Sequence, residues 1–495
     1  MKELKLNRTH ILAIVFAVAA NITAAAQQDT SSSFQLGSIS TPRTINPAAN
    51  STTPSSLAGQ QQNPFLGSVP TGTLSPEPIL LSLADAIGRG LRFNLGVVEN
   101  QDTLRQAQAQ KLRALSTMVP SVSALLRQNL DQLSTIAIGL RVPGLPLSTG
   151  QFSYQESYLA FSDTGLNLST MYQYRASRHT VEAQRLSLED AGNVVALAVG
   201  TAYLQVQASE ARVGTAQAEL AAARELESQT LNRVQSGLAA DIEGLRATVQ
   251  RQTSEQRVTV ALASLEKDKL TLARIIGLPS GQQFITTTKA AYQPWAGAEL
   301  EAALIQARAG RADLKSAQAA ASAAELSKRS AQLERAPGFS VNGYYGSIGH
   351  NLEHSVNTYS LVGTVSLPIF TGGRIRSEIQ DATAQSDRRQ SEYADLLGRV
   401  DYEVRNAFTD LQAADSAVKV AEKNSQLAQR TLDQARDRFL NGVTNNLEVV
   451  EAQQDVAAAN ENYISSLFAH NLAKLTLLRA IGAAEKDANK YLGGN

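Results

Sequence analysis

The chain repeats itself at an offset of 205 residues. The segment RVQSGLAADIEGLRATVQ, which starts at Arg233, has a counterpart in RFLNGVTNNLEVVEAQQ, which starts at Arg438. The two copies align without a gap from residue 202 to residue 277 of the first copy, where LARIIG matches LLRAIG of the second. A duplication of this length requires a fold made of two copies of one structural unit.

Each copy contains a long segment without proline. No proline lies between Pro146 and Pro279 or after Pro368, and a proline in the interior of a helix costs about 3 kcal/mol. Alanine and leucine recur every three or four residues along these segments, a spacing typical of the seam between packed helices. The sequence therefore predicts long helices that pack side by side.

A glycine interrupts each helical segment. About 65 residues precede Gly237 and Gly442 in their copies and about 35 follow, which gives helices of roughly 100 and 50 Å at 1.5 Å per residue. Glycine readily adopts the left-handed conformation that ends a helix, and Asp241 or Asn446 can cap the helix that follows. We therefore expect one helical hairpin in each copy.

The expected hairpin tips, residues 237–244 and 441–448, are followed or accompanied by acids. Glu243 lies in the first tip, and Glu448 and Glu451 stand three apart at the end of the second. A plain solvent-exposed turn between packed helices would explain the glycines and the capping residues. It would not explain the acids, which point to a further role for the tips.

Four segments are predicted to be strands. Residues 357–369 alternate apolar and mostly small polar side chains with a period of two, over about the length that an outer-membrane strand needs. Residues 339–349 supply the partner strand, and the first copy has a less regular pair at about 121–140 and 152–169. A membrane barrel needs about eight strands, and open sheet edges are not tolerated in lipid. If these strands span a membrane, several chains must share one barrel.

The N-terminus is predicted to direct export. Basic residues come first, the apolar run ILAIVFAVAA occupies 11–20, and AAA follows at 24–26, which together are typical of a signal peptide over residues 1–26. The apolar run is shorter than the roughly 20 residues of a membrane anchor. Residues 27–78 are rich in Ser, Thr, Pro and Gln, and this composition predicts a disordered tether.

The composition argues against several functions. The formal net charge is zero, so the basic face of a nucleic-acid-binding protein is not expected. The absence of cysteine excludes thiolate catalysis, cysteine-ligated zinc and a lipid anchor on an N-terminal cysteine. His350 and His354 stand four apart, but in a predicted loop, where a plain polar turn is favoured over a metal site. No catalytic constellation is present, and we expect neither an enzyme nor a bound cofactor.

One motif resembles a known family. LPIFTGGRIRSEI (367–379) is similar to the junction between the last strand and the following long helix in TolC-type outer-membrane efflux proteins. AYLQVQASEARV (202–213) and the two tip motifs, in the expected order, support this resemblance, which extends from residue 81 to residue 482. RADL (311–314) stands where the family usually has Arg-Pro-Asp-Leu.

The resemblance implies a homotrimer in which each chain gives four strands to a 12-stranded β-barrel in the outer membrane. The fold class implied is mostly α with a membrane β-barrel, built from a duplicated unit of two β-strands plus long helical hairpins. The helices of the trimer would form a long α-helical barrel across the periplasm. The partners implied are a periplasmic adaptor protein, an inner-membrane pump of unspecified class and outer-membrane lipid.

The resemblance also implies roles for individual residues. In the family, acids beyond the tip glycines line a narrow periplasmic entrance, where a ring of carboxylates attracts cations. Adaptor hairpins dock on the tips. The matching positions are Glu243, Glu448 and Glu451 for the entrance, Gly237, Leu238, Gly442 and Val443 for adaptor docking, and Pro368, Phe370, Gly372 and Gly373 for the strand-to-helix junction.

Two tip positions depart from the family pattern. Thr444 stands where family members can carry a basic residue that ties the closed state together, and Phe439 stands where a tyrosine is frequent. An ion pair from position 444 therefore cannot form here.

The function expected is a passive export duct in the outer membrane of a Gram-negative-type cell, extending into the periplasm. A periplasmic coiled-coil scaffold without a pore is the main alternative, although a scaffold has no use for the lipid-facing surface of the alternating strand. A secreted enzyme or adhesin is disfavoured by the duplicated hairpins. The expected divisions are a signal peptide (1–26), a tether (27–78), a first repeat (79–290) and a second repeat (291–495).

Overall fold

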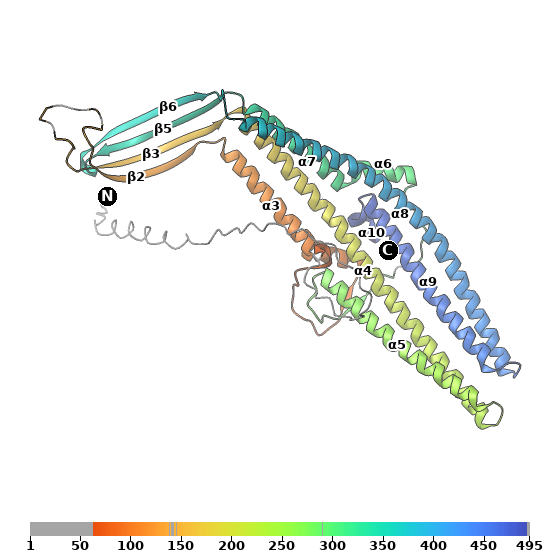
Figure 1. Cartoon of the computed structure of the whole chain (residues 1–495). Helices are drawn as coiled ribbons and strands as arrows, with labels where there is room; N and C mark the ends of the chain where they lie inside the picture. Colours follow the sequence, from red (N-terminus) through yellow and green to blue (C-terminus); the bar gives the residue numbers. More distant parts are fainter. Residues whose placement is uncertain (1–62, 138, 140–142, 145, 290, 493–495) are drawn as a thin grey trace, which may run out of the picture. The chain divides into compact units, whose positions relative to one another are not determined.

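The computed structural model describes residues 63–137, 139, 143–144, 146–289 and 291–492. The predicted signal peptide and most of the predicted tether lie outside these residues. The four longest helices are α4 (Leu168–Gln235), α5 (Asp241–Ile275), α8 (Arg374–Leu440) and α9 (Asn446–Ala480) (Figure 1). The shorter helical elements are η1 (Pro64–Leu66), α2 (Leu83–Phe93), α3 (Leu95–Ser116), α6 (Leu300–Gly310), α7 (Ala312–Leu333), η2 (Leu352–His354) and α10 (Ala484–Tyr491). The strands are β1 (Ile79–Leu81), β2 (Ser121–Asp131), β3 (Phe152–Leu166), β4 (Phe284–Thr286), β5 (Gly338–Gly349) and β6 (Ser355–Ser366).

Two long hairpins dominate the helical part. α4 packs against α5 and α8 against α9 (Figure 1). α4 has 68 residues and α8 has 67, so each is about 100 Å long. Small and aliphatic side chains fill the seams; Leu220, Ala223 and Leu226 of α4, for example, are buried. No helix in the described ranges combines the length and the hydropathy needed to cross a bilayer.

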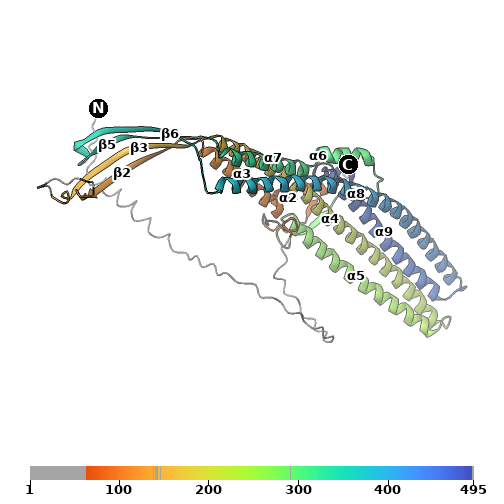
Figure 2. The same cartoon turned by 45° about the horizontal axis from the view of Figure 1, so that its top comes forward.

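The sheet shares its order with the helices. β2, β3, β5 and β6 form an antiparallel sheet in that order, with β2 and β6 at its edges. At one end of this sheet the strands continue into α3, α4, α7 and α8, and these helices pack on one another in the same order (Figure 2). The strand pairing therefore fixes which helices are neighbours. Together with the duplicated hairpins, this arrangement confirms the predicted fold class.

One face of the sheet is apolar. Directly paired residues lie on the same face, and the pairs Ala124–Leu159, Leu159–Tyr345 and Tyr345–Tyr359 therefore define one surface across all four strands. Every second residue joins it. Its large exposed members include Val122, Leu126, Leu130, Phe339, Leu361 and Val365. Leu126 is 79% exposed and Leu361 68%, so a broad apolar surface has no covering layer within the described part of the chain.

The opposite face is mostly polar, although the exposed Val356 and Val362 of β6 also lie on it. Arg127 lies 3.6 Å from Glu156 across β2 and β3, and Ser162 Oγ donates to Asn342 Oδ1 at 2.6 Å across β3 and β5. The rings of Tyr158 and Tyr344 lie on the same face, with their centroids 5.0 Å apart. Alternation along the strands has thus separated an apolar side from a hydrogen-bonded side.

Two strands are shorter than the sequence suggested. The strand expected over 121–140 ends at Asp131, because the chain turns there into a loop in which Gly139 and Gly144 have positive φ angles. The strand expected over 152–169 ends at Leu166, because Asn167 caps α4 by accepting a hydrogen bond from the Thr170 amide at 2.7 Å. Apolar residues beyond these points extended the alternation in the sequence beyond the sheet itself.

The prediction of a tether as far as residue 78 was wrong for its last part. The ring of Phe65 lies so close to Gly96 that a Cβ there would come within 2.4 Å of it. The amide of Val69 donates to Phe93 O at 2.9 Å and that of Thr71 to Gly277 O at 3.1 Å. Apolar side chains after a polar low-complexity segment thus attach residues 63–71 to the helical body.

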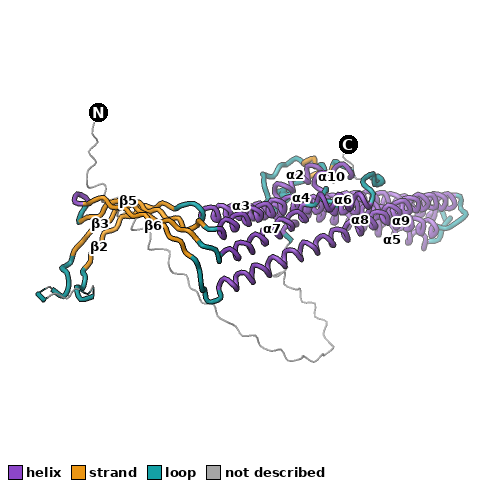
Figure 3. Tube along the Cα trace, turned by 90° about the horizontal axis from the view of Figure 1, so that it is seen from above, coloured by secondary structure: helices purple, strands orange, loops and turns teal. Residues whose placement is uncertain are grey.

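A compact cluster of small elements lies beside the long helices and was not predicted. β1 pairs with β4 in parallel, and Tyr203 of α4 donates its hydroxyl to Leu81 O at 3.0 Å. α2 and α10 pack on α4, and both lie on one side of the long helices (Figure 3). These elements give the middle of the molecule its main hydrophobic core.

Arg311 ties three helices together at the start of α7. Its side chain is 3% exposed and forms ion pairs of 2.6 Å with Asp313 and with Glu403 of α8. The same guanidinium donates to Ala480 O of α9 at 3.2 Å. The RADL motif therefore supplies both a buried cation and one of its acidic partners.

A second buried polar group surrounds His470 of α9. His470 is fully buried, and its Nε2 lies 3.7 Å from Asp415 Oδ1, which is longer than a hydrogen bond. Tyr292 donates to that same Oδ1 at 2.7 Å, and Lys419 pairs with the other oxygen. Burial lowers the pKa of His470 to about 4, with a further contribution from Lys474, so the imidazole is neutral at pH 7.

Stability is therefore expected to fall in acid through His470. Its unfolded-state pKa of about 6.5 lies above the folded value of about 4, so the unfolded chain takes up the proton first as the pH drops. Between pH 7.5 and 5 this proton uptake lowers the free energy of unfolding by about 2 kcal/mol. Chemical unfolding at the two pH values should show a smaller loss for His470→Gln than for the wild type. The exposed His179→Gln control should behave as the wild type, and equal losses in all three proteins would refute the assignment.

Candidate functional site

Both hairpin tips are built in the same way. α4 ends before Gly237, whose φ is +72°, and α8 ends before Gly442, whose φ is +71°. In each tip the amide of the next residue reaches back to an arginine carbonyl: Leu238 to Arg233 O at 2.8 Å and Val443 to Arg438 O at 2.9 Å. Glycine is required because other residues are strained at these angles. Leu238 and Val443 are left 72% and 67% exposed.

The helices that follow are capped differently from expectation. Asp241 and Asn446 were expected to act as caps, but both are the first residues of their helices. Asn445 is the cap of α9 and accepts from the Leu447 amide at 3.1 Å, whereas Ala240 precedes α5 without a side-chain bond. Asn446 is buried and donates to Glu243 O at 2.8 Å. It thus joins the two tips instead of capping one of them.

Two of the three predicted acids, Glu243 and Glu448, lie in the first turns of α5 and α9, and Glu451 lies in the second turn of α9. Glu448 lies 3.6 Å from Arg438, with both side chains partly exposed, and Glu451 is exposed one turn further along. The bond from Asn446 to the backbone of Glu243 holds the start of α5 against the start of α9. The structure therefore brings the acidic first turns of both hairpins side by side in a single chain.

Arg233 is the tip residue that the sequence analysis left without a role. It donates to Phe439 O at 2.7 Å, and its guanidinium carbon lies 4.7 Å from the centre of the Phe439 ring. Phe439 is 2% exposed and packs in a small hydrophobic cluster with Leu226 and Leu432. The sequence feature that could have identified Arg233 is the duplication, since Arg233 and Arg438 occupy the same position in the two copies. Only the first links the hairpins; the second faces the acid of its own hairpin.

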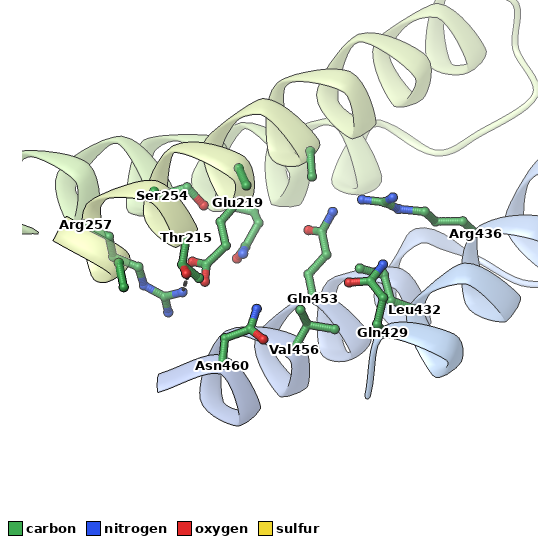
Figure 4. Close-up of a pocket in the computed structure, with 15 residues that line it drawn as sticks. Thr215, Glu219, Ser254, Arg257, Gln429, Leu432, Arg436, Gln453, Val456 and Asn460 are labelled. Carbon is green, nitrogen blue, oxygen red and sulfur yellow. Dashed lines mark hydrogen bonds and ion pairs between the residues drawn. The ribbon is translucent and has the colours of Figure 1, made fainter. Parts of the chain in front are cut away.

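Further from the tips, a polar cavity of about 560 Å³ separates the two hairpins (Figure 4). On one side Arg257 donates to Glu219 at 3.3 Å, and Arg436 points in from the other (Figure 4). Burial raises the pKa of Glu219 against the opposing effect of Arg257. Gln453 is 9% exposed, and its amide has no protein partner among the described residues. A polar cavity of this size suits water, so the hairpins are packed firmly near the tips and loosely above them.

The predicted strand-to-helix junction follows β6. Pro368 and Phe370 lie between the strand and α8, and Gly372 and Gly373 have φ angles of +62° and +90°, with Gly373 as the cap of α8. Phe370 is 89% exposed and its neighbour Ile369 94%. The two glycines turn the chain from sheet to helix and leave these apolar side chains pointing outward.

The histidine pair in the loop between β5 and β6 does not converge. His350 Nδ1 lies 2.9 Å from Ser153 O, and His354 Nδ1 lies 2.9 Å from Asn351 Oδ1. Among the residues described, no three His, Asp or Glu side chains gather in a metal-binding group.

The sequence and the fold both match one group of proteins. Residues 303–483 match the model of the outer membrane efflux protein family. The chain is 21% identical to nodulation protein T of Rhizobium leguminosarum over 379 residues, which cover 73% of this chain and 78% of the relative. It is 23% identical to the pyoverdine export outer membrane protein OpmQ of Pseudomonas putida, covering 77% and 81%.

Solved structures with the same fold cover most of the chain. The CmeC outer membrane channel of Campylobacter jejuni has a TM-score of 0.70 at 17% identity, covering 92% of this chain and 95% of CmeC. The outer membrane protein VceC of Vibrio cholerae has a TM-score of 0.69 at 19% identity, covering 81% and 96%.

Proposed function

The chain belongs to the TolC-like outer membrane efflux proteins, and from this premise we propose that it is the outer-membrane duct of a tripartite export system. It passively conducts substrates from a periplasmic adaptor and an inner-membrane pump to the cell exterior. The family forms trimers, is located in the outer membrane of Gram-negative bacteria and extends into the periplasm.

The two-faced sheet is the observation that carries this proposal. One face is apolar and exposed across all four strands, and the other carries hydrogen bonds and an ion pair. The edges β2 and β6 are free to pair with another copy. In lipid those edges must be satisfied. Three chains would close them into a barrel of 12 strands, with the apolar face toward lipid and the polar face toward a water-filled lumen. A scaffold without a pore leaves this apolar face unexplained.

The hairpin tips are the proposed periplasmic entrance. Glu448 and Glu451 lie at the start of α9, next to Glu243 at the start of α5. Three chains would set nine carboxylates around the threefold axis. Arg233 supplies the link between hairpins that Thr444 cannot make. The guanidinium of Arg233 donates to the backbone of Phe439 and lies over the ring of the same residue.

The same tips are the proposed docking surface for the adaptor. Leu238 and Val443 project from the turns at Gly237 and Gly442 and are mostly exposed. An exposed aliphatic side chain next to a tight turn provides a small apolar contact that another helical hairpin can cover. The matching geometry of the two tips gives each chain two such contacts.

Single-channel conductance in a planar bilayer tests the duct and its entrance together. The wild-type protein should give cation-selective steps, and Glu448→Gln/Glu451→Gln should lose most of this selectivity, since six of nine carboxylates are removed. Glu301→Gln, on the exposed surface of α6 far from the tips, should behave as the wild type. Selectivity unchanged in the double variant would overturn the entrance, and an absence of conductance from wild-type protein extracted from the outer membrane would overturn the duct.

A further inference from the structure

A basic groove lies between α4 and α7, close to the sheet. It has a volume of about 500 Å³ and is lined by Arg175, Arg178, His179 and Glu182 of α4 and by Leu326 of α7. Neither the entrance nor the adaptor-docking surface uses these residues.

The positive charge of the groove is not compensated. Arg185 pairs with Glu182 through hydrogen bonds of 2.8 and 3.1 Å, and these bonds lower the pKa of Glu182. Arg175 lies 5.2 Å from the ring centre of Tyr172, and neither Arg175 nor Arg178 forms an ion pair within the described part of the chain. Two exposed guanidinium groups, one turn apart on α4, are therefore available to a ligand.

The groove lies at the level of lipid headgroups if the sheet is in the membrane. α4 begins at Leu168, directly after β3, so Arg175 is about 10 Å along the helix from the end of the strand. The headgroup layer adds roughly 5–7 Å to each side of the hydrocarbon core, and an arginine side chain can extend several ångströms back toward it.

The groove faces away from the lumen. Arg178 stands two heptads before Gly192, so both lie on the same side of α4. At Gly192 this side is covered by Leu91 of α2 and Glu485 of α10. Elements packed on the inner side would fill a duct, so the covered side is the outer one. α4 and α7 are also the two central helices of the layer, away from the edge strands β2 and β6, where neighbouring chains would join.

We propose that this groove binds the phosphate of an anionic phospholipid in the periplasmic leaflet of the outer membrane, an inference that rests on the proposed function. Arg175 and Arg178 hold the phosphate, since guanidinium groups match phosphate oxygens with paired hydrogen bonds. Leu326 packs against the glycerol and the first carbons of the acyl chains. Three such sites fix the depth of the trimer in the bilayer.

Native mass spectrometry of the full-length protein in a neutral detergent, with added phosphatidylglycerol or phosphatidylcholine, tests the site. The wild type should retain phosphatidylglycerol in preference to phosphatidylcholine. Arg175→Gln/Arg178→Gln should bind phosphatidylglycerol about 25-fold more weakly, at about fivefold for each arginine lost near an anionic surface. Arg224→Gln is the matched control, because Arg224 is an exposed arginine of the same helix far from the sheet. It should retain the wild-type affinity.

Equal retention of both lipids by the wild type would overturn the proposal, and so would an equal loss of phosphatidylglycerol affinity in the double variant and the control. Complete displacement of phosphatidylglycerol by millimolar inorganic phosphate would also overturn it, because free phosphate would then be the ligand. Fractionation of the same cells separates this failure from that of the proposed function. Wild-type protein in the outer membrane without lipid preference refutes only the groove, whereas wild-type protein absent from that membrane refutes the duct.

Discussion

Leu361→Arg is expected to keep the chain from assembling in the outer membrane. Leu361 lies in the middle of β6 on the apolar face and is 68% exposed. An arginine at the centre of the lipid-facing surface of a barrel costs about 2–4 kcal/mol, and a trimer carries the substitution three times. Outer-membrane fractionation and native gel electrophoresis should show a loss of at least tenfold in trimer.

Ser360→Arg provides the matched control. Ser360 precedes Leu361 in the same strand but pairs with Tyr344 on the polar face, so its arginine would enter the water-filled lumen. Trimer yield should stay near that of the wild type. Equal loss in the two variants would show that β6 tolerates no large residue, and normal assembly of Leu361→Arg would place the apolar face away from lipid.

Arg311→Ala is expected to destabilise the helical part by about 3 kcal/mol or more. The substitution leaves Asp313 and Glu403 without their buried cation and removes the bond to Ala480 O. Removing one partner of a buried ion pair costs roughly 3–5 kcal/mol, because the other charge stays buried without a partner. The measurement is the shift of the denaturant midpoint followed by circular dichroism, which the long helices dominate.

Arg308→Ala is the control that shows whether the loss of stability in Arg311→Ala depends on the burial of the ion pair. Arg308 lies one turn before Arg311 and pairs with Asp401, but half of its side chain is exposed. An exposed pair contributes about 0–1 kcal/mol, so the midpoint should move little. Adding Asp313→Asn and Glu403→Gln to Arg311→Ala should restore part of the lost stability. A loss that the added substitutions leave unchanged would mean that packing, not charge, makes Arg311 important.

The sequence was most informative where the signal is local or periodic. The glycines at 237 and 442, the absence of proline and the alternation over 357–369 each depend on residues close together in the chain, and β6 spans Ser355–Ser366. The fold class expected from these patterns, and from the resemblance carried by residues 367–379, is confirmed. Boundaries were less certain where alternation continued past the sheet, as after Asp131.

Contacts between distant residues could not be predicted in this way. Arg233 and Phe439 are 206 residues apart, and Arg311 and Glu403 are 92 apart. Each of these arginines has many acids or aromatic rings nearby in sequence, and only the packing of the hairpins selects the partner. The same holds for β1 and β4, strands of three residues whose pairing joins residue 79 to residue 284. Such short elements carry too little periodicity to be recognised.

Each strand of the four-stranded sheet is connected to its own helix, so a ring of strands must join a ring of the same number of helices, and the two rings differ in circumference. Neighbouring strands lie about 4.8 Å apart, whereas packed helices need 8–10 Å, so a ring of helices is roughly twice as wide as an upright ring of the same number of strands. A tilt of about 45° raises the share of each strand to roughly 7 Å around the ring. The remaining difference must be absorbed where sheet becomes helix. Gly372 and Gly373 lie at that place, and their positive φ angles let the chain change direction between a narrower ring of strands and a wider ring of helices.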